Sequence, residues 1–129
     1  IRAIQTPVSI DFLAIRSYMG QASTGRVRIL KDLERDIKDR DVLVIEDIVD
    51  SGRTLTAILD ILSARQPRTL EVVTLLNKKA RREANVTARW IGFEIDDRFV
   101  VGYGMDLDDR YRNLPYIAEA TAIRIPDLS

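Results

Sequence analysis

The stretch VLVIEDIVDSGRTLTAILDIL, residues 42–62, decides the fold. A continuous apolar run leads into the carboxylates Glu46, Asp47 and Asp50, and small residues then lead into a helical pattern. That pattern places apolar residues at i, i+3, i+4 and i+7: Leu55, Ile58, Leu59 and Leu62. A helix with one apolar face directly after a strand predicts a βα unit. We expect DVLVIED, residues 41–47, to be a strand buried on both faces.

The remaining segments predict further strands of an α/β protein. VSIDFLAI (8–15) and GRVRILKDL (25–33) are expected to pair around a loop of small and hydroxylated residues, 17–25, which has the composition of a mobile lid. Pro67 is expected to close the helix. Further strands are expected at TLEVVTLLNK (69–78), ARWIGFEI (88–95), FVVGYGMDL (99–107) and near the end of YRNLPYIAEATAIRIPDLS (111–129). The sequence therefore predicts one α/β domain over residues 1–129, with a mostly parallel twisted sheet flanked by helices.

The composition narrows the class of function. The chain has 129 residues, with 20 basic and 20 acidic side chains, so its overall charge gives no reason to expect a nucleic-acid partner or an anionic membrane. It contains no histidine and no cysteine, so acid–base chemistry would fall to carboxylates or lysine. No apolar run approaches the roughly 18 residues that cross a bilayer, and the start lacks the form of a signal peptide. We expect a cytoplasmic protein that binds a small molecule.

The segment DSGRT, residues 50–54, has the composition of a phosphate-binding loop. Gly52 would let the backbone approach a phosphate, Ser51 and Thr54 would add hydroxyl donors, and Arg53 could add charge. Two other interpretations remain open. Ser51 or Thr54 could merely cap the helix. The acidic residues could instead belong to a receiver domain, where carboxylates at a strand end hold magnesium beside a phosphorylatable aspartate.

The motif VLVIEDIVDSGRTLT (42–56) resembles the phosphoribosyl-pyrophosphate motif of the type I phosphoribosyltransferases. Three further segments resemble the hypoxanthine-guanine phosphoribosyltransferases in order and spacing, over residues 8–117: DFLAIRSYMGQASTGRVRILKDL, VVTLLNKKARR and WIGFEIDDRFVVGYGMDLDDRYRNLPYI. The resemblance implies the type I phosphoribosyltransferase fold with part of a small hood. It implies a purine-salvage enzyme that uses Mg²⁺ and transfers the 5-phosphoribosyl group from phosphoribosyl pyrophosphate to hypoxanthine or guanine, giving IMP or GMP and pyrophosphate.

The resemblance also implies roles for the residues after the first long strand. Glu46 and Asp47 would face the ribose hydroxyls and a magnesium ion, and would stabilise the oxocarbenium-like charge that develops on the sugar. Asp50 would be the general acid–base near purine N7. The 5′-phosphate would be bound by Asp50 and the four residues that follow it, Ser51, Gly52, Arg53 and Thr54. A specific role for the Arg53 side chain is doubtful, because the family often has another residue type at that position.

On the purine side, Lys78 would donate to the exocyclic O6, which favours a 6-oxopurine over a 6-aminopurine. Without the resemblance, a lysine at a strand end is usually solvated. Phe99 would lie flat on the purine where an ordinary strand phenylalanine would be core, and Val100 would bind the base through its backbone. Asp106 would lie beside the base as a ligand of a second magnesium, or else be a solvated loop acid.

The pyrophosphate and lid residues come from the same resemblance. Arg112 would reach the pyrophosphate, and Arg82 would lie near the leaving group unless it belongs to a solvated basic face. Ser17 and Tyr18 would close over the site and exclude water.

Two alternatives to the enzyme remain: a non-catalytic regulator that senses phosphoribosyl pyrophosphate, or an inactive fragment with the same fold. Lys78 and FVVGYGMD disfavour an orotate or adenine transferase. The family is usually a homodimer or homotetramer, and its members carry a longer N-terminal segment. We therefore expect the chain by itself to be poorly active and to self-associate.

Overall fold

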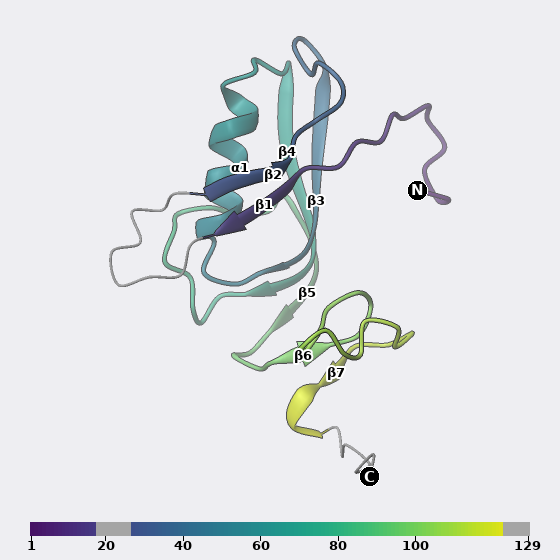
Figure 1. Ribbon diagram of the computed structural model, residues 1–129, viewed down its shortest axis with the longest axis vertical. Helices are drawn as coiled ribbons and strands as arrows, with labels where there is room; N and C mark the ends of the chain where they lie inside the picture. The colour runs from purple at the N-terminus through teal and green to yellow at the C-terminus, as the bar shows by residue number, and fades with distance from the viewer. Residues whose placement is uncertain (18–26, 123–129) are drawn as a thin grey trace.

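The computed structural model describes residues 1–17 and 27–122. These residues form short and long β-strands and one α-helix (Figure 1). Tyr18 and the rest of the expected lid to residue 25 lie outside the described residues. The elements are β1 (Ala14–Ser17), β2 (Val27–Lys31), β3 (Asp41–Val49), α1 (Arg53–Ser63), β4 (Thr69–Lys78), β5 (Trp90–Ile95), β6 (Val100–Val101), β7 (Ala118–Glu119) and a 3₁₀ turn, η1 (Ala120–Ala122).

The centre of the fold is a three-stranded parallel sheet with the order β3-β4-β5. β3 pairs with β4 from Asp41 opposite Thr69 to Val49 opposite Asn77, and the pairing of β4 with β5 ends at Lys78 opposite Ile95. The predicted α/β class and the parallel sheet are confirmed. Parallel strands bring their carboxyl ends to one edge of a sheet, which is where ligands bind in open α/β folds.

Helix α1 covers one face of this sheet and forms the core with it (Figure 1). Its predicted apolar face is confirmed, because Leu55, Ile58 and Leu62 are buried. The prediction that residues 41–47 are buried on both faces is wrong: Leu43 is 47% exposed and Ile45 is 69% exposed. Side chains alternate across a strand, and α1 packs on only one side of it, so these two residues fall on the open side.

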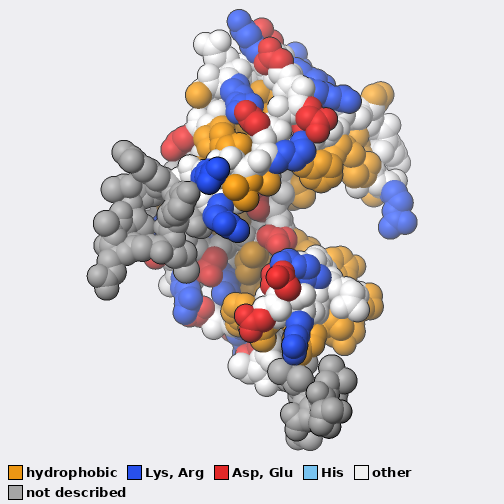
Figure 2. Space-filling view, viewed as in Figure 1, with side chains coloured by type: hydrophobic (Ala, Val, Ile, Leu, Met, Phe, Trp, Pro, Cys, Tyr) orange, Lys and Arg blue, Asp and Glu red, His pale blue; other side chains and the backbone are white. Residues whose placement is uncertain are grey.

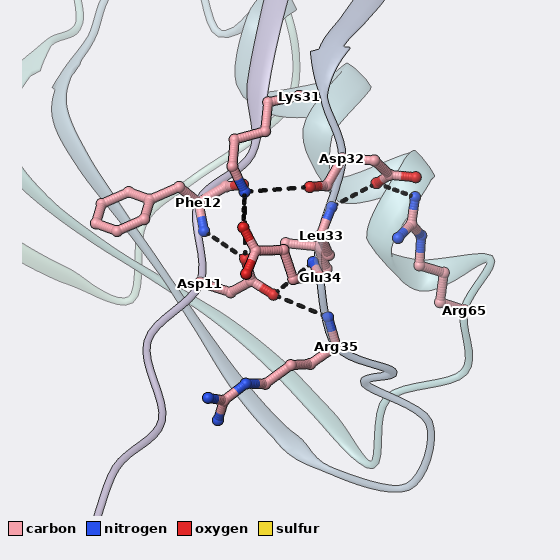
Figure 3. Close-up of polar contacts among 8 residues, drawn as sticks. All are labelled: Asp11, Phe12, Lys31, Asp32, Leu33, Glu34, Arg35 and Arg65. Carbon is pink, nitrogen blue, oxygen red and sulfur yellow. Dashed lines mark hydrogen bonds and ion pairs between the residues drawn. The ribbon is translucent and has the colours of Figure 1, made fainter.

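β1 and β2 form an antiparallel pair, as predicted, but both are shorter than expected. β1 begins at Ala14 and not at Val8, because the preceding segment is held by a side chain instead of a strand ladder (Figure 3). The Asp11 carboxylate accepts hydrogen bonds from the backbone N–H groups of Glu34 at 2.8 Å and Arg35 at 3.1 Å. This contact ties the N-terminal segment to the loop after β2.

Further polar contacts complete the connection shown in Figure 3. Lys31 Nζ lies 3.8 Å from Asp11 Oδ1. Burial opposes ionisation of Asp11, but its hydrogen bonds to backbone N–H groups and the charge of Lys31 hold its pKa below the ordinary value. Arg65, just after α1, donates to Asp32 Oδ1 at 2.6 Å. The segment after β2 is therefore tied both to the N-terminal segment and to the end of the helix.

The segment from residue 99 departs from the prediction. Only Val100 and Val101 form a strand, β6, which pairs antiparallel with the short β7, so the expected strand 99–107 is wrong beyond Val101. The backbone turns left-handed at Gly102 (φ 96°), Tyr103 (φ 55°) and Gly104 (φ 95°), which an extended strand cannot accommodate. β6 and β7 lie on the side where the strands of the central sheet end (Figure 1).

Candidate functional site

The carboxyl ends of the central strands bring the predicted acidic residues together. β3 and its following turn carry Glu46, Asp47 and Asp50, which line a cavity of about 210 Å³ that also includes Ser51 to Gly52 and Thr54. Figure 2 shows the molecule hollowed between its upper part and the part that contains β6 and β7, with acidic side chains at the inner end of the hollow. A cavity whose lining includes carboxylates and hydroxyl groups can hold a small charged ligand.

The turn that leads into α1 leaves its first N–H groups available to a ligand. Gly52 is the N-cap residue, with a left-handed φ of 82°, and no side chain caps this helix end. The contact between Ser51 Oγ and the Arg53 N–H is long, at 3.4 Å. The interpretation that Ser51 or Thr54 serves only as the helix cap is therefore wrong. Exposed N–H groups and the positive end of the helix dipole suit an anion.

The loop after β4 holds this turn in place through backbone hydrogen bonds. The Ser51 carbonyl accepts hydrogen bonds from the N–H groups of Glu83 at 3.0 Å and Ala84 at 3.1 Å. A Cβ added at Gly52 would lie 2.7 Å from Val86 Cγ1, so only glycine fits here without movement. The conformation of the turn is thus fixed by the protein itself.

Arg82 lies under the same turn. Its guanidinium donates to the Asp50 carbonyl at 3.1 Å and the Val49 carbonyl at 3.4 Å, and also to Asn77 Oδ1 and the Val86 carbonyl. The solvated-face interpretation of Arg82 is wrong, because the side chain is partly buried among these acceptors. Its expected place near the leaving group stays a prediction.

The two adjacent acids of β3 repel each other electrostatically. Burial, and then the neighbouring charge of Asp47, raise the pKa of Glu46 to about 6. Asp47 is exposed, and its Oδ1 accepts the Ile48 N–H at 2.7 Å. A bound cation would relieve the repulsion between the two carboxylates.

These carboxylates fit a magnesium ion that is shared with a substrate. No group of three or more acidic, histidine or cysteine side chains among the described residues could hold a metal ion, so Glu46, Asp47 and Asp106 do not converge on one complete protein site. Magnesium commonly binds through one or two carboxylates together with substrate phosphates and water. The hard oxygen donors of Glu46 and Asp47 match that mode.

Lys78 lies at the end of β4 and is only 5% exposed. The interpretation of Lys78 as a solvated strand end is therefore wrong. Its Nζ is 3.4 Å from Asp50 Oδ2 and 3.6 Å from Asp97 Oδ1. Asp50 Oδ1 is buried, with no hydrogen-bond partner in the part of the chain that the structure describes. A buried ammonium and a buried carboxylate oxygen without a partner among the described residues thus lie together at the carboxyl ends of β3 and β4, where Asp50 also lines the cavity.

Sequence reasoning missed Asp97, which lies two residues beyond β5. The register of β5 on β4, with Ile95 opposite Lys78, brings Asp97 to Lys78. The available signal was an acidic residue just after a strand parallel to the one that carries Lys78.

The segment between β5 and β7 carries the other residues predicted for the purine and the pyrophosphate. Phe99 is 54% exposed, so its interpretation as a core residue is wrong, and Val100 follows it in β6. Asp106 Oδ1 lies 3.0 Å from Arg112 Nη2, and its Oδ2 accepts the Asp109 N–H at 2.8 Å. Asp106 is therefore part of a polar turn and not a freely solvated acid.

Arg112 connects this turn electrostatically with β3. A hydrogen bond to Asp109 is the largest cause that raises the pKa of its guanidinium; burial opposes the rise, and the charges of Asp106, Asp109 and Asp47 add to it. Asp47 thus acts on Arg112, which places the acidic end of β3 and the predicted pyrophosphate residue in one electrostatic environment. The backbone of Ser17 ends β1; its side chain, like Tyr18, is outside what the structure describes.

The chain matches known proteins along most of its length. Residues 1–108 match the phosphoribosyl transferase domain. The hypoxanthine phosphoribosyltransferase of Escherichia coli K12 is 51% identical over 119 residues, which cover 92% of this chain and 67% of that protein. The hypoxanthine-guanine phosphoribosyltransferase of Mycobacterium avium is 55% identical over 117 residues, 90% of this chain and 58% of that protein.

Solved structures give the same result. A hypoxanthine phosphoribosyltransferase from Staphylococcus aureus superposes with a TM-score of 0.88 at 50% identity, covering 92% of this chain and 65% of that one. The Trypanosoma cruzi hypoxanthine phosphoribosyltransferase in complex with the product IMP gives a TM-score of 0.82 at 39% identity, covering 88% and 60%. The chain thus spans roughly two thirds of the length of these relatives. No helix within residues 1–17 and 27–122 is long and apolar enough to span a membrane. With a domain match over most of the chain, close relatives and a shared fold, the chain belongs to the phosphoribosyltransferase family.

Proposed function

We propose that this protein is a purine-salvage enzyme that transfers the 5-phosphoribosyl group of phosphoribosyl pyrophosphate to a 6-oxopurine, hypoxanthine or guanine, giving IMP or GMP and pyrophosphate. The observation that carries the proposal is the buried Lys78 ammonium, 3.4 Å from the Asp50 carboxylate at the ends of β3 and β4. An ammonium only donates hydrogen bonds, so it recognises an exocyclic oxygen and rejects an exocyclic amine. The names of the relatives support the same substrate class.

The turn after β3 would bind the 5′-phosphate of the sugar. The N–H groups at the start of α1, which no side chain caps, would donate to phosphate oxygens, and the Ser51 and Thr54 hydroxyls would add donors. Gly52 lets the backbone come close. Because residues 82–86 already hold the turn in place, little ordering would be needed on binding.

Glu46 and Asp47 would face the ribose, where positive charge develops as the bond from C1 to pyrophosphate breaks. Carboxylates fixed near that charge stabilise the transition state more than the ground state. Magnesium, when bound, would supply positive charge to the pyrophosphate and ribose oxygens, held by Glu46, Asp47 and, at a second position, Asp106. Asp50 would exchange a proton with purine N7, and Arg112 would donate to the leaving pyrophosphate.

On the base, Lys78 would donate to O6, Phe99 would stack on the ring and Val100 would bind through its backbone. The half-exposed Phe99 side chain supports a role in ligand stacking, since an open aromatic face suits a flat ring. Ser17, Tyr18 and Arg82 would complete the lid and the pyrophosphate side.

A spectrophotometric assay of hypoxanthine, guanine, xanthine and adenine with phosphoribosyl pyrophosphate and magnesium tests this proposal in the full-length protein. We expect turnover with hypoxanthine or guanine and none with adenine. Asp50→Asn should lower turnover by about two to four orders of magnitude while the binding of phosphoribosyl pyrophosphate persists, since general acid–base catalysis contributes on that scale. Absence of turnover with every 6-oxopurine would refute the function, and an unchanged single-turnover rate in the variant would remove Asp50 from it.

We also propose that the enzyme acts in the cytoplasm as a homodimer or homotetramer, without a nucleic-acid or membrane partner. Analytical ultracentrifugation and cell fractionation test these points separately from the activity.

A further inference from the structure

Four charged side chains at or just beyond the ends of β3, β4 and β5 alternate in sign: Asp50, Lys78, Asp97 and Arg81. Lys78 Nζ lies between two carboxylates, 3.4 Å from Asp50 Oδ2 and 3.6 Å from Asp97 Oδ1. Arg81 Nε donates to the other oxygen of Asp97 at 2.9 Å. The Lys78 side chain is 6% exposed, whereas Asp50 and Asp97 are about 40% exposed, at 40% and 42%.

The ammonium is held loosely by both acids. A charge-assisted hydrogen bond between an ammonium and a carboxylate is typically about 2.7–2.9 Å long, and both distances here exceed that. An ammonium has three donors. Lys78 therefore has a fixed position between two counter-charges and retains donor capacity for a third acceptor.

The second carboxylate matters when the first one changes state. In the proposed reaction Asp50 exchanges a proton with the purine, so at that moment it no longer neutralises Lys78. An ammonium buried to this degree without a counter-charge is strongly unfavourable. Asp97 is not part of the proton exchange, and its contact with Arg81 keeps its carboxylate oriented.

We propose that Asp97 is a positioning residue that keeps the Lys78 ammonium directed toward the exocyclic oxygen of the base while Asp50 takes part in proton transfer. This inference rests on the proposed function, and it goes beyond it because that function gives Asp97 no part in binding the sugar or the leaving group. It assigns to the loop between β5 and β6 a part in recognising the 6-oxo group through Lys78.

The adjacent residue provides a matched control. Asp96 is also an aspartate of this loop, but its side chain is 88% exposed, and its ion pair with Arg98 is 3.9 Å long. Asp97→Asn and Asp96→Asn each remove one negative charge from the same loop, with nearly the same side-chain shape. Only Asp97→Asn removes one of the two counter-charges of Lys78.

The experiment measures steady-state kinetics of the full-length protein with hypoxanthine or guanine, together with the unfolding midpoint of each variant. Asp97→Asn should lower kcat/KM for the base by about tenfold, the scale of one weakened interaction with a charged group. KM for phosphoribosyl pyrophosphate should stay within about twofold, because Lys78 faces the base, and Asp97→Glu should recover part of the loss. Asp96→Asn should behave as the unmodified protein.

A double-mutant cycle separates positioning through Lys78 from a general effect on the loop. In a Lys78→Ala background, Asp97→Asn should have almost no further effect on kcat/KM, since the residue it positions is gone. A loss of the same size in that background, or equal behaviour of the two aspartate variants, overturns the inference while leaving the proposed function standing. Absence of turnover in the unmodified protein overturns both.

Discussion

Replacing Glu46 by glutamine should stabilise the protein in the absence of ligand while damaging its proposed activity. Burial and Asp47 raise the pKa of Glu46 from 4.5 to about 6. The folded protein therefore binds this proton more tightly than the unfolded chain does. The favourable effect is fully present below about pH 4.5 and is lost as the pH rises through about 6, so at pH 8 the ionised carboxylate destabilises the fold.

The size of this effect follows from the pKa. At 1.36 kcal/mol for each pKa unit, the rise in the pKa of Glu46 from 4.5 to about 6 corresponds to about 2 kcal/mol. Because Glu46 is only partly buried, solvent screens part of this, and about 1 kcal/mol is a better expectation. For a domain of this size that is a rise of roughly 3–5 °C in the unfolding midpoint at pH 8. At pH 4.5 and below, the variant and the unmodified protein should have similar midpoints.

Thermal unfolding at pH 4.5, 6 and 8, with and without magnesium and phosphoribosyl pyrophosphate, tests this reasoning. Asp47→Asn is the control, and it should recover a smaller share of the stability because burial is the larger cause of the raised pKa. With ligand present the order should reverse, since a ligand at 100 times its Kd adds about 2.7 kcal/mol to a protein that binds it. A variant less stable than the unmodified protein at pH 8, or a difference independent of pH, would refute the reasoning.

Four further substitutions, one of them a control, have expected outcomes. Gly52→Ala should cost roughly 1–2 kcal/mol of stability because its backbone is left-handed, and it should also weaken the binding of phosphoribosyl pyrophosphate. Gly104→Ala is the control, because Gly104 has a similar φ and nothing lies within 4 Å of the added Cβ, so it should show only the backbone cost. Chemical denaturation and ligand titration compare the two variants. Lys78→Ala should reduce the use of 6-oxopurines by about 1–3 kcal/mol while sugar binding changes little, and equal small losses for both substrates in steady-state kinetics would contradict this. Asp11→Asn should lower the unfolding midpoint at pH 7. Because folding lowers the pKa of Asp11, its contribution to stability is present above pH 3.8 and is lost as the pH falls through the folded pKa. The midpoints of the variant and the unmodified protein should therefore converge in acid.

The central βαβ unit could be predicted from sequence because its signals are local. The spacing from Leu55 to Leu62 fixes the buried face of α1, and TLEVVTLLNK forms β4 over the predicted residues, Thr69–Lys78. The order of acids and small residues then places Glu46 to Thr54 at the carboxyl end of the sheet, where the structure has them. Local periodicity and strand direction carry this part of the prediction.

The errors concern features that depend on distant residues. β1 is shortened because Asp11 bonds to residues 23 and 24 positions later, which no periodicity shows. Whether both faces of β3 are covered depends on which elements pack against the sheet, and the apolar run of β3 alone does not predict those elements. β6 ends early because Tyr103 takes a left-handed conformation between two glycines.

For the candidate site, a motif names single residues, but their surroundings depend on tertiary register. Lys78 was identified, but its burial and its second counter-charge, Asp97, follow from the pairing of Lys78 with Ile95 across two strands. Arg82 was recognised as a basic residue of interest, yet its hydrogen bonds to the carbonyls of Val49 and Asp50 depend on how the loop after β4 folds back.

The contact of Arg82 with the turn before α1 has a consequence for the rate of ligand capture. Because one guanidinium donates to the carbonyls of both Val49 and Asp50, the turn before α1 is held in place before any ligand arrives. Binding of a phosphorylated sugar there should show a single fast phase whose rate is proportional to ligand concentration, without a plateau from a slow rearrangement. Lysine keeps the positive charge but lacks the planar guanidinium that donates to two carbonyls at once. In stopped-flow experiments on Arg82→Lys, the observed rate should therefore reach a plateau as the ligand concentration rises.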